Sequence, residues 1–143
     1  EIEYNLYEAG LARPKVKAAD FHGKEAYVQQ RELETQAAYL CTFELGDTTD
    51  SNGVIRYPVG NWPILDRDTK DVIVDSHGRR SYTTSMAYGP SLGKNIAMGY
   101  LPADKAVEGD VVLIEYFGEH YDATVMKVGY GALLDPTNER PRS

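Results

Sequence analysis

The fold of this chain is decided by residues 81–102, which read SYTTSMAYGPSLGKNIAMGYLP. The first half is rich in β-branched and aromatic residues, which suit the pleated surface of a strand. Gly89 and Pro90 end that strand, because proline has no N–H donor and restricts the residue before it. From Ile96 to Tyr100, large and small side chains alternate, and a strand face made of small residues usually lies against another backbone. The stretch predicts two strands joined at a Gly-Pro corner, in a small barrel or sandwich.

Further strands are predicted on both sides of this stretch. Upstream, Tyr39, Cys41, Phe43 and Leu45 fall on one face in strict alternation, which predicts a half-buried strand over residues 37–45. Shorter strands or extended edge pieces are predicted at residues 54–57, 62–65 and 71–75. Strands over residues 110–117 and 122–128 follow, joined by a hairpin over residues 118–121. Turns are predicted over residues 66–70, 76–79 and 102–109.

The N-terminal part contains the single predicted helix. Asp20 is a suitable N-cap for a helix over residues 24–34, and Phe21 can pack back onto its first turns. Before the helix, alternation of apolar and polar residues over residues 2–6 predicts a short strand.

The helix and the strands separated by Gly and Pro predict a mainly β fold. We expect a small Greek-key-like β-barrel of about six to seven strands, preceded by one α-helix. The 143 residues have room for one domain, and 42% hydrophobic with 26% charged residues is ordinary for a globular protein. A formal charge of 15 − 22 = −7 argues against general nucleic-acid binding. No apolar run approaches the roughly 18 residues that a membrane helix needs.

The single cysteine and the first residues of the chain indicate the cellular location of the protein and whether the chain is a fragment. Cys41 is the single cysteine, which excludes an intrachain disulfide and a cysteine-based metal site. It is predicted to be a buried small hydrophobe, and a cytoplasmic location is expected. The chain starts at Glu1 with nothing that resembles a signal peptide, and the lack of an initiator methionine predicts a fragment or a processed chain.

The sequence contains no recognisable catalytic motif, such as a nucleophile elbow, a P-loop, a dinucleotide fingerprint or a metal-spaced His/Cys set. We therefore predict no catalytic residue and no metal ligand, and leave the cofactor-binding residues unassigned. The Gly89-x-x-x-Gly93-Lys94 spacing is similar to a phosphate loop, but it lacks the following Ser/Thr and lies between predicted strands. The loop around Asp47, Asp50 and Ser51 suggests calcium, yet it lacks the ligand spacing and closing glutamate of a calcium loop, so a solvated loop is favoured.

The histidines offer two further candidates. His22 could be a ligand or a base, but without a partner at ligand spacing it is interpreted as a residue near the helix cap. His120 is predicted to lie exposed on a hairpin tip.

Three stretches resemble the C-terminal barrel region of the glycine-cleavage T-protein (aminomethyltransferase)-like family, and they occur in the same order along the chain as in that family. They are EAGL over residues 8–11, KAADFHGKEA over residues 17–26 and YGPSLGKNIAMGYLP over residues 88–102. The stretches EGDVVLIEYFG (108–118) and YDATVMK (121–127) resemble the closing hairpin of that family, so the resemblance covers roughly residues 8–128. These enzymes are tetrahydrofolate-dependent aminomethyltransferases and their demethylase relatives.

The resemblance implies a domain organisation. Residues 1–35 would be a linking segment and helix from a preceding folate-binding body, residues 36–130 the C-terminal β-barrel, and residues 131–143 a surface tail. Without that body, residues 1–16 are expected to be poorly ordered or to dock on a neighbouring copy. The segment between Tyr57 and Thr84 is longer than in ordinary T-proteins, which favours the vanillate/syringate O-demethylase branch.

The resemblance also implies a function. The chain would be the C-terminal domain of a tetrahydrofolate-dependent methyl- or aminomethyltransferase, with folate and a small methyl or aminomethyl donor as partners. The barrel would close the folate cleft without supplying the catalytic group, so the isolated chain is expected to be inactive. Family members place a tyrosine near the chain end against the cofactor; residues 135–140 have none, and Tyr130 is the nearest candidate. Arg79 and Arg80 could engage an anion such as a folate glutamate tail, although a solvated turn is favoured.

An alternative function is a non-catalytic binding or assembly module built on the same barrel. In that case Tyr57, Trp62 and Tyr88 would be the exposed contact surface, and the fragment could associate with itself.

Overall fold

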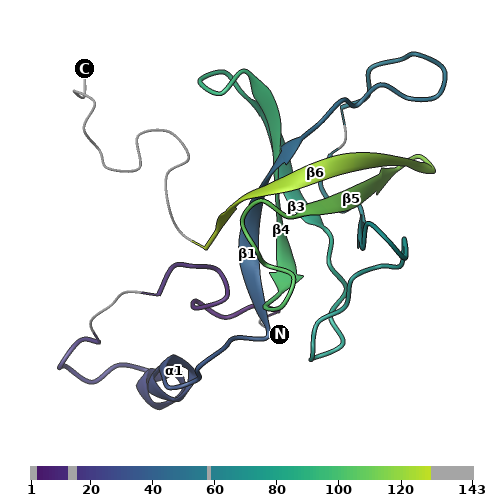
Figure 1. The fold of residues 1–143 in the computed structure, drawn as a ribbon. Coiled ribbons are helices and arrows are strands. Elements are labelled where there is room, and N and C mark those ends of the chain that lie inside the picture. The colour runs from purple at the N-terminus through teal and green to yellow at the C-terminus, as the bar shows by residue number, and fades with distance from the viewer. Residues whose placement is uncertain (1–2, 13–15, 58, 130–143) are drawn as a thin grey trace.

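The computed structural model describes residues 3–12, 16–57 and 59–129. Tyr130 and the predicted surface tail lie outside these residues. The described elements are α1 (Lys24–Arg31), β1 (Ala38–Leu45), β2 (Ile64–Leu65), β3 (Thr83–Gly89), β4 (Lys94–Pro102), β5 (Val111–Tyr116) and β6 (Glu119–Val128) (Figure 1). The predicted mainly β fold with one preceding helix is confirmed. Among the described residues, no helix has the length and apolar character that crossing a bilayer requires.

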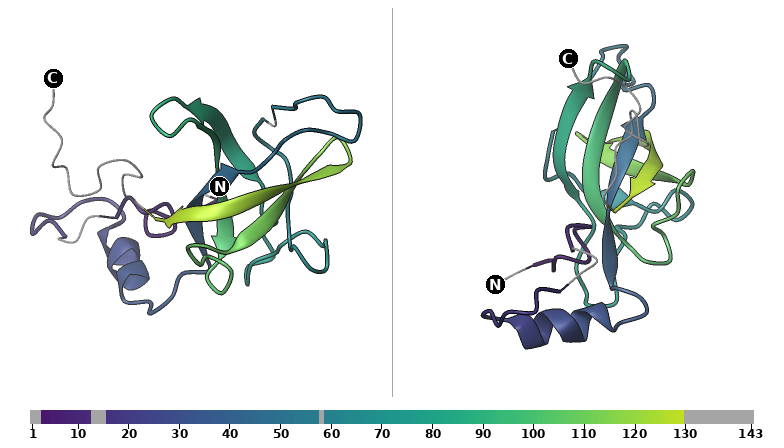
Figure 2. Two further views of the ribbon diagram at one scale, coloured as in Figure 1. Left: turned by 45° about the horizontal axis from the view of Figure 1, so that its top comes forward. Right: turned by 90° about the vertical axis from the view of Figure 1, so that its left-hand side faces the viewer.

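The strands form one antiparallel sheet that curls strongly on itself (Figure 2). Their order across the sheet is β2-β5-β6-β1-β4-β3, so β2 and β3 are its edges. These edges meet: the Ile64 amide donates to the Ser81 carbonyl at 3.0 Å, and the Thr83 amide donates to the Trp62 carbonyl at 2.8 Å. A bridge between Pro63 and Tyr82 lies between these bonds. The curled sheet is therefore nearly closed into a barrel, as predicted.

The core lies inside this curl. Its largest fully buried side chains are Phe43, Ile64, Leu65, Leu101, Ile114, Val125, Thr83 and Cys41. The predicted face of small residues on β4 is confirmed at Gly99, which lies against the place where the β2 and β3 edges meet. A Cβ atom there would lie 2.7 Å from both the Tyr82 carbonyl oxygen and the Ile64 Cδ1 atom. The absence of a side chain at position 99 is what lets the two edges approach.

The predicted Gly-Pro corner joins β3 to β4. The Gly93 amide donates to the Gly89 carbonyl at 2.8 Å, and Gly93 has a φ of 68°, a left-handed conformation that glycine adopts at low steric cost. The strands paired by this corner run from Thr83 opposite Gly99 to Gly89 opposite Lys94.

Several predicted elements differ from the structure. The helix ends at Arg31 rather than residue 34, and its N-cap is Gly23, with no side-chain cap, rather than Asp20. Phe21 does pack back onto the helix, because its ring contacts Tyr27 with the centroids 6.4 Å apart. The chain reaches the helix through a left-handed glycine, with a φ of 82°, so the Asp20 carboxylate is too early to cap it.

The short strand predicted over residues 2–6 is wrong in its described part, because residues 3 and 4 form a bend and a turn begins at residue 6. The expectation that residues 1–16 are poorly ordered or dock on a neighbouring copy is also wrong for residues 3–12. The Leu40 amide at the start of β1 donates to the Glu8 carbonyl at 2.8 Å, so the segment packs on its own barrel.

Three other predicted segments are only partly correct. Residues 54–57 and 71–75 make isolated bridges instead of strands: Ile55 pairs with Thr49, Val72 with Leu65 and Val74 with Arg80. The hairpin between β5 and β6 turns at Phe117 and Gly118, so residues 119–121 already belong to β6.

Candidate functional site

The N-terminal segment, residues 3–12, is fastened to the barrel through Arg79. Both terminal nitrogens of its guanidinium bond the carboxylate of Glu8, and Nη1 also bonds the Glu3 carbonyl. The Nε atom donates to Asp75 Oδ2 at 2.6 Å, within the turn that carries Arg79. The Glu8 and Asp75 side chains are each 3% exposed and that of Arg79 is 17% exposed. This is a nearly buried ion triad that joins two distant parts of the chain.

Aromatic rings surround this triad. The Tyr4 ring stacks on Tyr100 of β4 with centroids 3.6 Å apart and an interplanar angle of 3°. The Arg79 guanidinium carbon lies 4.3 Å from the centroid of the Tyr4 ring. The Tyr82 hydroxyl donates to Glu3 Oε2 at 2.9 Å. Stacking and hydrogen bonding thus hold the segment against the β3–β4 side of the barrel.

The charges of the triad stabilise one another. Hydrogen bonding to Glu8 raises the pKa of Arg79 further above its ordinary value, despite the opposing effect of burial. Burial by itself would raise the pKa of Asp75, but hydrogen bonds from Arg79 and His77 lower it. Burial also raises the pKa of the Tyr4 phenol. Arg79 and Asp75 are therefore held in their charged forms, and Asp75 is not poised as a general base at neutral pH.

A pocket of about 750 Å³ lies beside the triad, between residues 3–9, the start of α1 and the turn before Arg79. Its size is that of a small-molecule site. Its aromatic and imidazole walls come from Tyr4, Phe21, Tyr27, His22 and His77. The Arg79 guanidinium at its edge is already bonded to carboxylates, so the pocket has no free guanidinium to hold an anion.

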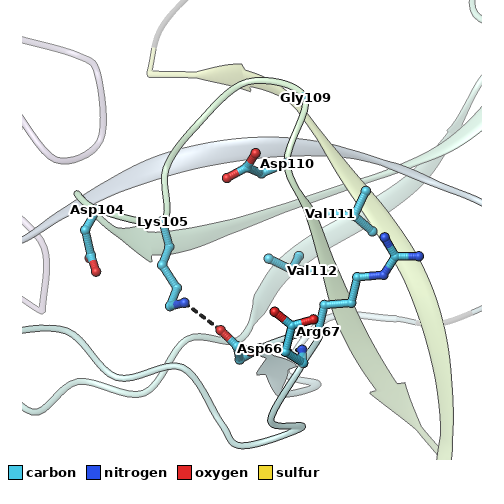
Figure 3. A pocket seen from close by; sticks show the side chains of 9 residues that line it. Asp66, Arg67, Asp104, Lys105, Gly109, Asp110, Val111 and Val112 are labelled. Atoms are coloured by element: carbon cyan, nitrogen blue, oxygen red, sulfur yellow. Dashed lines mark hydrogen bonds and ion pairs between the residues drawn. The ribbon is translucent and has the colours of Figure 1, made fainter.

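A second hollow, of about 480 Å³, lies on the outer surface where the turn after β2 meets the loop between β4 and β5 (Figure 3). Its polar lining residues are Asp66, Arg67, Asp68, Asp104, Lys105 and Asp110. Lys105 Nζ donates to Asp66 Oδ2 at 2.5 Å, and this bond lowers the pKa of Asp66 to about 2. Among the described residues, no group of His, Cys, Asp or Glu side chains is arranged to hold a metal ion.

The structure shows where the arginines and histidines considered in the sequence lie. Arg79 is in the buried triad, so neither the anion site nor the solvated turn is correct for it, while Arg80 is exposed. His22 does lie just before the helix, in the aromatic pocket. His120 is exposed but lies within β6, opposite Glu115, rather than on the hairpin tip.

The polar loop over residues 47–53 is more ordered than the favoured solvated loop. Asp50 is 8% exposed, and its carboxylate accepts hydrogen bonds from the amides of Asn52 and Val54. Arg56 pairs with the same carboxylate at 2.7 Å. These contacts account for the aspartate without a bound cation.

The remaining candidates are separated by the fold. Lys94, at the end of the glycine spacing, pairs with Glu44 of β1. Tyr57 and Tyr88 line a common groove of about 190 Å³. Trp62 does not join them, because it is half-buried against the core and contacts Tyr116.

Glu8, Asp75 and Tyr4 meet at this site, although none of them was predicted from the sequence to be a site residue. Their only signal is polar and aromatic character, which many exposed residues share. The curl of the sheet brings the turn carrying Arg79 back to the N-terminal segment, and sequence spacing does not reveal that approach.

Comparisons with known proteins identify relatives of this chain. The family model of the glycine cleavage T-protein C-terminal barrel domain matches residues 57–128. An aminomethyltransferase of Koribacter versatilis is 27% identical over 125 residues, which are 87% of this chain and 29% of that protein. The mitochondrial dimethylglycine dehydrogenase of Rattus norvegicus is 28% identical over 124 residues, which are 87% of this chain and 12% of that protein. This chain thus spans less than a third of the length of these curated relatives.

A solved structure shares the fold. The glycine cleavage system aminomethyltransferase T from Bartonella henselae aligns with a TM-score of 0.55 and 21% sequence identity. The match covers 75% of this chain and 25% of that one.

Proposed function

The chain belongs to the family of the glycine cleavage T-protein C-terminal barrel domain, and from this membership we propose that it is the C-terminal domain of a tetrahydrofolate-dependent methyl- or aminomethyltransferase. A one-carbon unit passes from a small donor to N5 of tetrahydrofolate in this reaction. The barrel walls the folate cleft and excludes water, while the preceding body supplies the reacting groups. Folate and the donor are its partners in the longer enzyme.

The observation that carries this proposal is the attachment of residues 3–12 to the barrel. Arg79, Glu8 and Asp75 form a nearly buried triad, and Tyr4 stacks on Tyr100. A domain joined at that end of the chain is held in a fixed orientation to the barrel wall. A wall that closes a cleft needs this rigidity, because misplacement of substrate by about 1 Å can lower a rate by about a hundredfold.

The charges of the described sites also suit a wall rather than a reacting centre. Two buried carboxylates are bonded to Arg79, and the Lys105 bond holds the pKa of Asp66 at about 2. A general base works best with a pKa near the operating pH. These residues are therefore suited to holding structure, and the reacting group is assigned to the preceding body.

Within the family, we favour the O-demethylase branch, in which an aromatic methoxy group is the donor. This preference rests on the long segment between Tyr57 and Thr84, which contains β2, the turns over residues 66–70 and 76–79, and Arg79. The buried free thiol of Cys41 suits a reducing compartment, and we place the enzyme in the cytoplasm.

Single-turnover assays test the proposal. The longer enzyme that contains this barrel is mixed with tetrahydrofolate and either a vanillate-type methoxy aromatic or an aminomethyl carrier, and the folate product is measured by mass spectrometry. We expect methyl transfer from the methoxy donor by the longer enzyme and none by the 143-residue chain alone. Methyl transfer by the isolated chain would contradict the assignment of a wall, and transfer only from the aminomethyl carrier would exclude the O-demethylase branch.

A further inference from the structure

The tip of the β5–β6 hairpin carries an unusual residue for its backbone. Phe117 and Gly118 form the turn, with φ angles of 52° and 76°. Two-residue hairpin turns with both angles positive favour asparagine, aspartate or glycine at the first position. A bulky side chain in the left-handed region is strained, and such outliers are found where function requires them.

The Phe117 side chain is also exposed, because 70% of the residue's surface is accessible to solvent. It is not a loose ring. Its centroid lies 4.6 Å from that of Tyr116 and 5.4 Å from that of Trp62, which themselves contact each other. Trp62 in turn packs against the hydrophobic core. These three rings, here named the aromatic tip, are a rigid apolar surface held up to solvent at one end of the barrel.

Acidic side chains flank the aromatic tip. Glu119 lies opposite Tyr116 in the β5–β6 register, and Glu115 lies opposite His120. Glu119 accepts a hydrogen bond from Ser51, whose hydroxyl is neutral. The 41% exposed Glu115 side chain has His120 Nε2 at 4.0 Å, a pair that is ionic only when the histidine is protonated. The whole chain has a formal charge of −7. Such a surface repels phosphate-bearing membranes and nucleic acids and attracts a cationic partner.

We propose that the aromatic tip is a docking surface for a basic, arginine-containing segment of a partner protein. A guanidinium stacks on the face of an aromatic ring and pairs with a carboxylate beside it, so this combination of rings and glutamates fits arginine in particular. Aromatic side chains in the centre of an interface carry much of its affinity. This role accounts for a strained phenylalanine at a turn position where asparagine would be more stable.

Trp62 provides the measurement, because it is the single tryptophan of the chain and one of the three rings. The 143-residue chain is titrated with an octapeptide of alternating arginine and leucine, and its tryptophan fluorescence is recorded. An octapeptide with glutamate in place of arginine and vesicles of anionic lipid are titrated in parallel. We expect a saturable change with the arginine peptide alone.

Two substitutions separate docking from folding. Phe117→Asn installs the favoured turn residue, so it should raise the midpoint of urea unfolding and weaken the peptide affinity by about tenfold or more. Phe117→Tyr keeps the ring and should retain binding. Tyr88→Asn, which removes a 61% exposed ring elsewhere, is the matched control and should leave binding unchanged.

The proposal is overturned by a Phe117→Asn protein that binds the peptide as well as the unmodified chain does. It is equally overturned if the glutamate peptide or the lipid vesicles give the stronger response, or if no titration changes the fluorescence.

Discussion

Arg79 bonds the carboxylate of Glu8, a residue 71 positions earlier in the chain, with the Nη1 and Oε2 atoms 3.2 Å apart. The bond crosses from the turn before β3 to the segment that precedes the helix. Because Glu8 also accepts the Leu40 amide through its backbone carbonyl, the segment is fixed to the barrel at two points. The orientation of the N-terminal segment is therefore set by long-range contacts rather than by its own sequence.

Replacing Arg79 should loosen that segment and destabilise the protein. Arg79→Met leaves two buried carboxylates without their cation, and breaking a buried pair in this way costs about 3 kcal/mol or more. Urea unfolding followed by Trp62 fluorescence measures the loss, and hydrogen exchange should increase in residues 3–12. Arg67→Met, which removes a 55% exposed partner of Asp122, is the control and should change stability by about 0.5 kcal/mol or less. Equal stability of the two variants would refute the role of the triad.

Gly99→Ala should strain the closure of the barrel. The added methyl group would lie 2.7 Å from the Tyr82 carbonyl oxygen, a backbone atom directly before β3 that cannot move away cheaply. We expect a loss of about 1–3 kcal/mol in the free energy of unfolding. Gly46→Ala is the matched control, since its new methyl group would meet the Asp122 carbonyl oxygen at 3.6 Å, an ordinary contact. Thermal unfolding of both variants by circular dichroism compares them, and an unaffected Gly99→Ala protein would contradict the close approach.

Thr83→Val should weaken the contact between the two sheet edges. The buried Thr83 hydroxyl accepts the Trp62 amide at 3.1 Å and donates to the Val59 carbonyl at 3.1 Å. Valine has a similar shape but leaves these groups unpaired, which costs about 1–3 kcal/mol. Exposed Thr84, substituted in the same way, should have little effect. Amide exchange at Trp62 is the local measurement, and protection retained in Thr83→Val would show that the hydroxyl is dispensable.

The thiol of Cys41 should be inert in the folded protein. Burial raises its pKa from 9.0 to about 12, so the folded state keeps the proton while the unfolded chain releases it. The stabilisation that follows is fully present below pH 9 and is lost as the pH rises from 9 towards 12. We expect no reaction with a thiol reagent at pH 8 until urea unfolds the chain. The loss of stability as the pH rises above 9 should be smaller in Cys41→Ala than in the unmodified chain, in which the buried thiol adds to the effect of buried phenols such as Tyr4. Rapid labelling of the folded protein would contradict the burial.

The local pattern of the sequence predicted much of the sheet. Alternation in β1 placed Cys41, Phe43 and Leu45 on the inner face, and all three are buried. The small residues of β4 correctly indicated the close approach at Gly99. The Gly-Pro corner between β3 and β4 was predicted for the same reason: turn residues act through their own backbone angles, which are a local property.

The candidate site was much less predictable. Arg79 lies on a turn, and an arginine on a turn is usually solvated. Asp75 belongs to the same turn, but Glu8 does not, and turn geometry alone does not bring Glu8 to Arg79. The helix start was misplaced because Asp20 is a good cap by residue type, whereas the chain reaches the helix through Gly23. Trp62 was expected on the surface, but the meeting of the sheet edges draws it against the core.

By itself, the sequence determined most of the long strands, the buried face of β1, the corner between β3 and β4, and the family to which the barrel belongs. These features depend on periodicity and turn chemistry over a few residues. Only the tertiary structure decided that Arg79 meets Glu8 and that Phe117 completes a three-ring surface with Trp62 and Tyr116. Such pairings arise when the twisted sheet curls and its edges meet, because side chains that are far apart in the chain then come into contact.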